Sequence, residues 1–177
     1  MCVTNRVPMT ISMYDASIPV FKQMMGTLST ILDKAETHAR SNNIAPETLL
    51  RARLFPDMYD LIRQVQMASD FAKAVSARLA NLEVPSYPDN ETNFQELQQR
   101  VDKTVQFLSS IPRERVDGSE EREIVVRAGT PREKTYIALP YLLHHGLPQF
   151  FFHVTAAYAI LRSKGVEIGK TDYMGRV

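Results

Sequence analysis

The sequence has little cysteine, little excess charge and no long apolar run. Cys2 is the single cysteine among 177 residues, which excludes a disulfide framework and a thiolate metal site and suits a reducing compartment. Lysine and arginine number 21 against 20 acidic residues, so net charge favours neither nucleic acid nor an anionic membrane as a partner. There is no signal-peptide pattern, and no segment approaches the roughly 20 apolar residues of a membrane span. We therefore expect a soluble, cytoplasmic protein that binds neither nucleic acid nor membranes.

Motifs of nucleophilic catalysis are also missing. The chain contains no G-x-S-x-G, no paired histidine motif and no C-x-x-C, so a serine or cysteine nucleophile has no support. A glycine-lysine-threonine triplet at residues 169–171 lacks the preceding glycine of a phosphate-binding loop. Any chemistry must therefore come from other side chains.

What the sequence does contain is helical periodicity. Hydrophobic residues make up 44% of the chain, enough for one core, and we expect a single domain over residues 1–177. Apolar residues recur three and four positions apart in three long segments, and a fourth segment is apolar on nearly every face. These segments predict helices over residues 12–39, 57–81, 92–110 and 148–164. Thr92 and Gln95 have the spacing of a capping box at the start of the third helix. The tail, residues 165–177, is too polar for a fifth helix.

The connection between the third and fourth predicted helices is long and highly charged. Within it, "REIVVRAG" and "KTYIAL" could pair as a short β-hairpin. Its length also permits a crossover instead of simple up-and-down order. The predicted fold class is all-α, a four-helix bundle with a long helix 3 to helix 4 connection that could carry this hairpin.

The predicted last helix, "QFFFHVTAAYAILRSKG", carries one histidine, His153, in an apolar stretch, with Gln149 one turn earlier on the same face. A buried imidazole needs partners, because an unpaired buried polar group costs about 1 to 3 kcal/mol. Gln66 and Asp70 are candidates, four positions apart on the flank of the second predicted helix. The sequence thus predicts a polar pocket between the second and fourth helices, centred on His153 and lined also by Tyr158.

Two further histidines precede this helix. Gly146 and Pro148 predict that His144 and His145 lie in an approach loop, since proline disrupts the preceding turn. From there His145 could lean over the mouth of the pocket.

The last helix resembles that of the DinB/YfiT-like superfamily, four-helix bundles whose fourth helix reads H-x-x-x-H-R-G-Q-L-x-x-x-L-R-x-x-G. His153 falls on the second histidine of this pattern, Leu161 and Arg162 on its Leu-Arg pair, and Gly165 on its final glycine. Gln149 replaces the first histidine. "LFPDMYDLIRQVQMASDFAKAVSARLA" and "IGKTDYMG" are similar to a branch known as a domain of unknown function, so the resemblance covers most of the chain.

The resemblance implies a divalent metal such as zinc or nickel, held in the superfamily by three histidines, and thiol-dependent transfer, isomerisation or hydrolysis. Carried over, the ligands would be His153, Gln149 and, at the nearest position of the second helix, Gln66. Neutral amides are weak ligands, so we expect a degenerate metal site and favour no cofactor over a weakly held ion. Two other interpretations of His153 stay open: a hydrogen-bonded core residue, and an acid, base or donor in a metal-free ligand pocket.

Two functions remain open. The first is a small-molecule enzyme or binder that uses this pocket. The second is a non-catalytic bundle that acts through dimerisation or contact with another protein. Phe150, Phe151 and Phe152 point in three directions, so at least one could face a second subunit, and we expect a homodimer.

Overall fold

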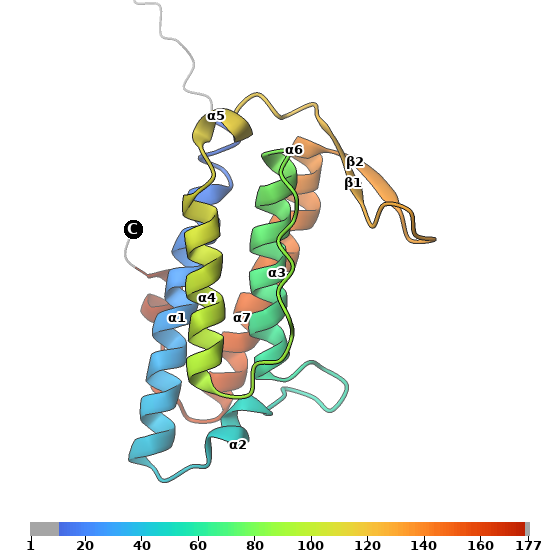
Figure 1. Ribbon diagram of the computed structural model, residues 1–177. Coiled ribbons are helices and arrows are strands. Elements are labelled where there is room, and N and C mark those ends of the chain that lie inside the picture. Colours follow the sequence, from blue (N-terminus) through green and yellow to red (C-terminus); the bar gives the residue numbers. More distant parts are fainter. Residues whose placement is uncertain (1–10, 176–177) are drawn as a thin grey trace, which may run out of the picture.

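The computed structural model describes residues 11–175 as four long helices with one β-hairpin (Figure 1). The long helices are α1 (Ile18–Ser41), α3 (Leu61–Leu79), α4 (Phe94–Ser109) and α7 (Leu147–Ser163). The short helices are α2 (Pro46–Leu50), α5 (Arg113–Val116), α6 (Ala138–Tyr141) and α8 (Lys170–Met174), and a π-helical turn, η1 (Leu142–Gly146), joins α6 to α7. The strands are β1 (Glu123–Val126) and β2 (Lys134–Ile137). The predicted bundle and its hairpin are confirmed, whereas Cys2 lies outside the described residues.

Capping side chains decide where α3 and α4 begin. Oδ1 of Asp60 accepts a hydrogen bond from the N–H of Arg63 at 3.0 Å, and Oδ1 of Asn93 accepts one from the N–H of Glu96 at 2.9 Å. The predicted starts at residues 57 and 92 are therefore too early. The predicted cap at Thr92 is wrong, because Thr92 lies one position earlier and donates its N–H to Oε2 of Glu96 at 2.6 Å.

The two ends of the described chain also differ from prediction. α1 starts one residue before Pro19, since proline suits the first turn of a helix, and residues 13–17 form turns instead of the expected helical start. The tail does form a helix, α8. It is held by tertiary contacts that no periodicity could reveal: Oδ1 of Asp172 lies 2.6 Å from Nζ of Lys34 on α1, and Oδ2 accepts from the N–H of Gly169 at 2.8 Å.

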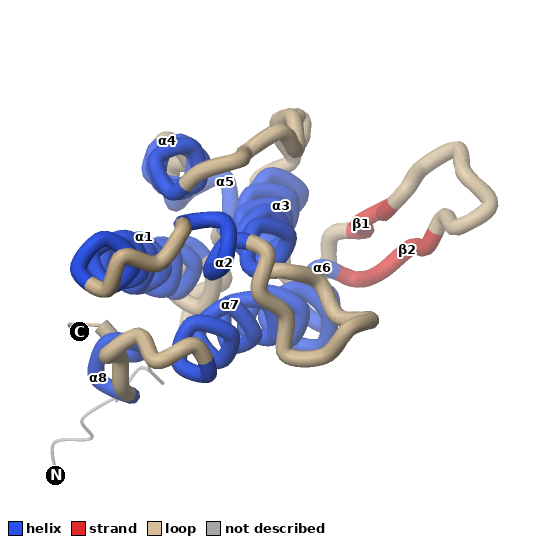
Figure 2. The backbone as a smooth tube through the Cα atoms, turned by 90° about the horizontal axis from the view of Figure 1, so that it is seen from below, coloured by secondary structure: helices blue, strands red, loops and turns tan. Residues whose placement is uncertain are grey.

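The long helices follow the order α1, α4, α3, α7 around the core (Figure 2). α3 and α4 run parallel, so the chain returns along the bundle between them through residues 80–93 (Figure 1). The crossover of this bundle is therefore the connection from α3 to α4. The long connection from α4 to α7, for which the sequence permitted a crossover, stays at one end of the bundle. All four helices contribute buried apolar side chains, among them Phe21, Leu28, Val65, Leu97, Val101, Phe150 and Ile160. Within the described residues, no helix combines the length and hydrophobicity that a membrane crossing requires.

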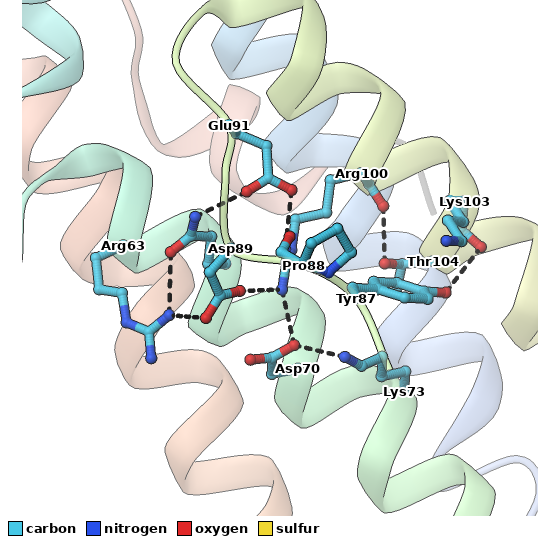
Figure 3. Close-up of polar contacts among 11 residues, drawn as sticks. Arg63, Asp70, Lys73, Tyr87, Pro88, Asp89, Glu91, Arg100, Lys103 and Thr104 are labelled. Carbon is cyan, nitrogen blue, oxygen red and sulfur yellow. Dashed lines mark hydrogen bonds and ion pairs between the residues drawn. The ribbon is translucent and has the colours of Figure 1, made fainter. Parts of the chain in front are cut away.

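Arg100 of α4 ties the crossover to the bundle (Figure 3). Its side chain is buried, and Nη2 lies 2.8 Å from Oδ1 of Asp70 on α3 and 3.0 Å from Oδ1 of Asp89 in the crossover. Nη1 lies 2.8 Å from Oε1 of Glu91 and donates to the carbonyl of Pro88 at 3.0 Å. A buried charge requires such partners, so this arginine joins α3, α4 and the crossover.

The hairpin leaves the bundle where α3 ends and α6 begins (Figures 1 and 2). β1 and β2 pair antiparallel, with Glu123 opposite Ile137. Ile124 is buried and anchors the strand, and Arg122 donates to the carbonyl of Leu79, the last residue of α3. These contacts hold the hairpin beside the end of α3 and the approach to α7.

Candidate functional site

The chain enters α7 through helical turns. α6, η1 and α7 follow one another without a break, so the loop predicted for His144 and His145 is wrong. Pro148 lies at the start of α7, directly after the π turn, so the proline is accommodated within a continuous helical run. A Cβ on Gly146 would lie 2.9 Å from Cγ2 of Val75, so the glycine lets the π turn pack closely on α3. π turns are frequent at functional sites, and this one carries His145.

A cavity of about 560 Å³ lies between α3, the η1 to α7 junction and the hairpin. Its volume falls within the roughly 300 to 1,000 Å³ typical of small-molecule sites. The aromatic side chains of its lining are Phe71, Tyr136 and Tyr141, and the polar ones are Asp70, Arg78, Arg127, Arg132, Lys134, His145 and Gln149. Three of the predicted site residues, Asp70, His145 and Gln149, therefore lie at one cavity.

His145 is packed among aromatic rings at this cavity. Its ring stacks on those of Tyr136 and Tyr141, at centroid distances of 5.4 and 5.5 Å. Burial lowers the pKa of His145, and the positive charges of Arg78, Lys134 and Arg127 lower it further. The imidazole is therefore neutral at pH 7 and can accept a proton or a hydrogen bond.

Arg78 and Tyr141 form the inner wall. Nη1 of Arg78 donates to the hydroxyl oxygen of Tyr141 at 3.0 Å, which orients the guanidinium group. Tyr141 is 1% exposed, and burial raises the pKa of its phenol, so it stays protonated at neutral pH. The carboxylate of Asp70 is less available to a ligand, since its Oδ1 already contacts Nζ of Lys73 at 2.6 Å and Nη2 of Arg100 at 2.8 Å.

His153 lies one helical turn after Gln149 on α7 and does not line the cavity. It is 5% exposed, and its Nδ1 lies 2.8 Å from Oε1 of Gln64 on α3. Nε2 of Gln64 donates to the carbonyl of Tyr59 at 3.3 Å, which directs Oε1 towards the histidine as an acceptor. Nδ1 therefore carries the proton of the neutral ring. Burial and the charge of Arg63 lower the pKa of His153 to about 4.

Phe71 separates the two histidines. Its ring stacks on His153 at 5.6 Å and meets His145 edge to face at 6.2 Å. Tyr59 lies on His153 as well, with ring centroids 6.5 Å apart and planes inclined by 22°. His153 is thus a hydrogen-bonded side chain in an aromatic setting behind the cavity wall, while His145 lines the cavity itself.

Gln66 and Tyr158 have other neighbours. Oε1 of Gln66 accepts from Nη1 of Arg63 at 3.0 Å, and its Nε2 donates to Oε2 of Glu91 at 2.7 Å. Tyr158 meets the ring of Tyr173 on α8 at 5.7 Å. Neither residue lines the cavity. Gln66 lies one turn before Asp70 on α3, where its amide is engaged by Arg63 and Glu91. Tyr158 is nine positions from Gln149 on α7, so these two side chains point in roughly opposite directions.

The metal implied by the resemblance finds a poor donor set here. Zinc sites use imidazole, thiolate or carboxylate ligands, typically three from the protein at a catalytic centre. Among residues 11–175, no group of three or more His, Cys, Asp or Glu side chains could hold a metal ion. The guanidinium of Arg63 occupies the amide oxygen of Gln66 and would repel a cation there. His153, Gln149 and Gln66 therefore do not fit a tight zinc or nickel centre.

Several site residues escaped prediction, among them Gln64, Phe71, Arg78, Tyr136 and Tyr141. A signal for Gln64 was present: it lies three positions after Leu61 and four before Ala68, on the buried stripe of α3. Tyr136 had no such signal, nor did the hairpin cations, Arg127, Arg132 and Lys134, because their approach to α3 depends on how the hairpin docks.

Comparison with known proteins agrees with this architecture. Residues 13–174 match the family described as "Domain of unknown function (DUF1993)". The chain is similar to a DinB family member protein from Shewanella denitrificans whose crystal structure was determined at 1.83 Å resolution. The two are 36% identical with a TM-score of 0.85, over 93% of this chain and 92% of the other. No curated protein matches the chain.

Proposed function

Because the chain belongs to the DUF1993 family and has a DinB-like fold, we propose that it binds or converts a small molecule in the cavity between α3, α7 and the hairpin. The observation that carries this proposal is the convergence of His145, Gln149 and Tyr136, from three elements, on one concave site. A cavity with a few convergent polar groups is the usual form of a ligand site. A cytoplasmic location belongs to the same proposal, since a single cysteine suits a reducing compartment.

The chemistry available at the cavity is proton transfer and hydrogen bonding. His145, neutral at pH 7 because its pKa is lowered, can take a proton from a bound ligand and return it. Gln149 offers one amide acceptor and two donors. The ring of Tyr136 supplies a flat apolar surface. Such a set supports binding alone or a reaction that needs one general base.

A ligand screen followed by thermal unfolding tests this proposal. A ligand present at 100 times its dissociation constant should stabilise the protein by about 2.7 kcal/mol. His145→Ala and Gln149→Ala should reduce the shift in Tm, whereas His144→Ala should preserve it, because His144 is exposed and does not line the cavity. Equal effects of the His144 and His145 variants would contradict the proposed site.

We also propose that the protein holds no resident metal. One imidazole and two neutral amides, with a guanidinium on one of the amides, form a weak set for zinc or nickel. Elemental analysis of untagged wild-type protein and His153→Ala tests this. We expect no stoichiometric zinc or nickel in either. Near-stoichiometric metal that disappears in the variant would contradict the proposal and make the amides ligands.

A second candidate function is contact with another copy or another protein. Phe152 on α7 is 57% exposed and meets the ring of His153 edge to face, and the exposed Tyr59 stacks on the same histidine. Exposed aromatic side chains are frequent at interfaces. Light scattering coupled to size exclusion should detect a dimer that Phe152→Ser weakens. A monomer at all concentrations would remove self-association from consideration.

A further inference from the structure

We propose that the ligand of the cavity is a small organic anion, whose carboxylate or phosphate group contacts Arg78 and the hairpin cations and whose flat apolar part lies on Tyr136. This inference rests on the proposed ligand site and specifies its chemistry. It follows from the charges that line the cavity, from their lack of ion-pair partners and from the orientation of one arginine.

The cavity is strongly positive although the chain as a whole is nearly neutral. Its lining contains four cations, Arg78, Arg127, Arg132 and Lys134, and one acid, Asp70. The carboxylate of Asp70 is already neutralised by Lys73 and Arg100, as described above. The positive charge of the other four is therefore not balanced within the cavity, and it favours an anion there.

The four cavity cations also lack ion-pair partners. In residues 11–175, none of them lies within 4.0 Å of a carboxylate oxygen of Asp or Glu. Other arginines of the bundle differ: Arg63 pairs with Asp89, and Arg100 pairs with three acids. Cations that converge on a cavity without acidic partners match what an anion site requires.

Arg78 is oriented for such a role. It is half-buried on α3, and its bond to the hydroxyl of Tyr141 engages Nη1 and leaves the other donors of the guanidinium for a ligand. A planar guanidinium can form paired hydrogen bonds to carboxylate or phosphate. The half-buried ring of Tyr136 lies 5.5 Å from that of Tyr141 and offers a flat apolar surface for a group attached to that anion.

Calorimetric titration of the full-length chain tests the proposal with four probes: benzoate, phenyl phosphate, the neutral benzyl alcohol and inorganic phosphate. We expect benzoate or phenyl phosphate, or both, to bind about tenfold or more tightly than benzyl alcohol, since one charged hydrogen bond is worth at least that factor. The stronger of the two identifies the anionic group. Inorganic phosphate should bind more weakly than phenyl phosphate, because it lacks the ring.

Variants locate the effect. The double variant Arg127→Gln/Lys134→Gln changes two exposed hairpin side chains and should fold normally while weakening the anionic probe about tenfold. Arg78→Gln should weaken it at least as much. Lys164→Gln, a matched change of an exposed cation near the other end of α7, should leave binding unchanged.

The outcomes separate this inference from the function on which it rests. Benzyl alcohol binding as tightly as the anions, with loss in His145→Ala, would overturn the anion and keep the ligand site. A weakening as large in Lys164→Gln as in the hairpin variant would overturn the anion site, since it would indicate general charge attraction. Failure of all four probes, together with a ligand screen that finds nothing, would overturn both.

Discussion

Nδ1 of His153 on α7 donates a hydrogen bond to Oε1 of Gln64 on α3, 2.8 Å away. Both side chains are buried, and the carbonyl of Tyr59 fixes the orientation of the amide. This bond joins two antiparallel helices beneath the cavity wall and satisfies the one imidazole in an otherwise apolar face. The contribution of this hydrogen bond can therefore be measured through the free energy of unfolding.

Gln64→Leu should destabilise the fold by about 1 to 3 kcal/mol, because it leaves the N–H of His153 buried without an acceptor. Urea unfolding of Gln64→Leu, His153→Phe and the double variant measures the coupling. We expect the double variant to be more stable than the sum of the single changes predicts, since two apolar groups leave nothing unpaired. Strict additivity would show that the hydrogen bond contributes nothing.

Stability should fall with acid between pH 6.5 and pH 4 partly through His153. The pKa of His153 is about 4 in the folded protein, against an ordinary value of 6.5. Above pH 6.5 the ring is neutral in both states. As the pH falls through this window the unfolded chain binds a proton that the folded chain does not, so the free energy of unfolding decreases, by at most about 3 kcal/mol.

The control for this pH effect is His153→Phe. Acidic groups also titrate as the pH falls, so the informative quantity is the difference in unfolding free energy between wild type and variant at each pH. The unfolding free energy of the wild type minus that of the variant should therefore decrease as the pH is lowered from 6.5 to 4. A constant difference would contradict a lowered pKa for His153.

Removal of Arg100 should be severe. Arg100→Met leaves Asp70, Asp89 and Glu91 without their shared cation, and breaking a buried ion pair costs about 3 to 5 kcal/mol. The matched control is Arg113→Met, which removes two surface ion pairs, with Asp15 and Asp117, and should change the denaturation midpoint little. Similar midpoints for the two variants would show that the crossover is held by other contacts.

Gly146→Ala should destabilise the junction between η1 and α3 by about 1 to 3 kcal/mol, because the added methyl group overpacks against Val75. Val75→Ala should rescue it in the double variant. Gly26→Ala is the control, since a Cβ at this position on α1 meets no atom within 4 Å and alanine favours helix by about 0.5 to 1 kcal/mol. Thermal unfolding of the wild type, Gly146→Ala, Gly146→Ala/Val75→Ala and Gly26→Ala tests the close packing of the π turn.

Helices and the hairpin were predictable because their signals are local. The spacing of apolar residues along α3, such as Leu61, Val65 and Ala68, depends on neighbours within two turns. Exact starts were less accessible, because Asp60 and Asn93 compete with nearby residues as caps, and the backbone geometry decides between them. α8 escaped prediction since its contacts come from α1.

The site was only partly predictable. Asp70, His145 and Gln149 were singled out by type and spacing, and all three line one cavity. The partner of His153 is Gln64 and not Gln66, since the rotation of α3 about its axis decides which of two glutamines faces α7.

By itself, the sequence determined that this chain forms a bundle of four long helices, and that its single cysteine has no second cysteine in these residues with which to form a disulfide. Only the tertiary structure decided that residues 80–93 return along α3, that the π turn turns His145 towards α3, and that the hairpin brings Arg127, Lys134 and Tyr136 to the same cavity. The reason is physical. Periodicity encodes which face of a helix is buried, whereas a site between elements depends on how helices rotate and loops dock, which long-range contacts alone determine.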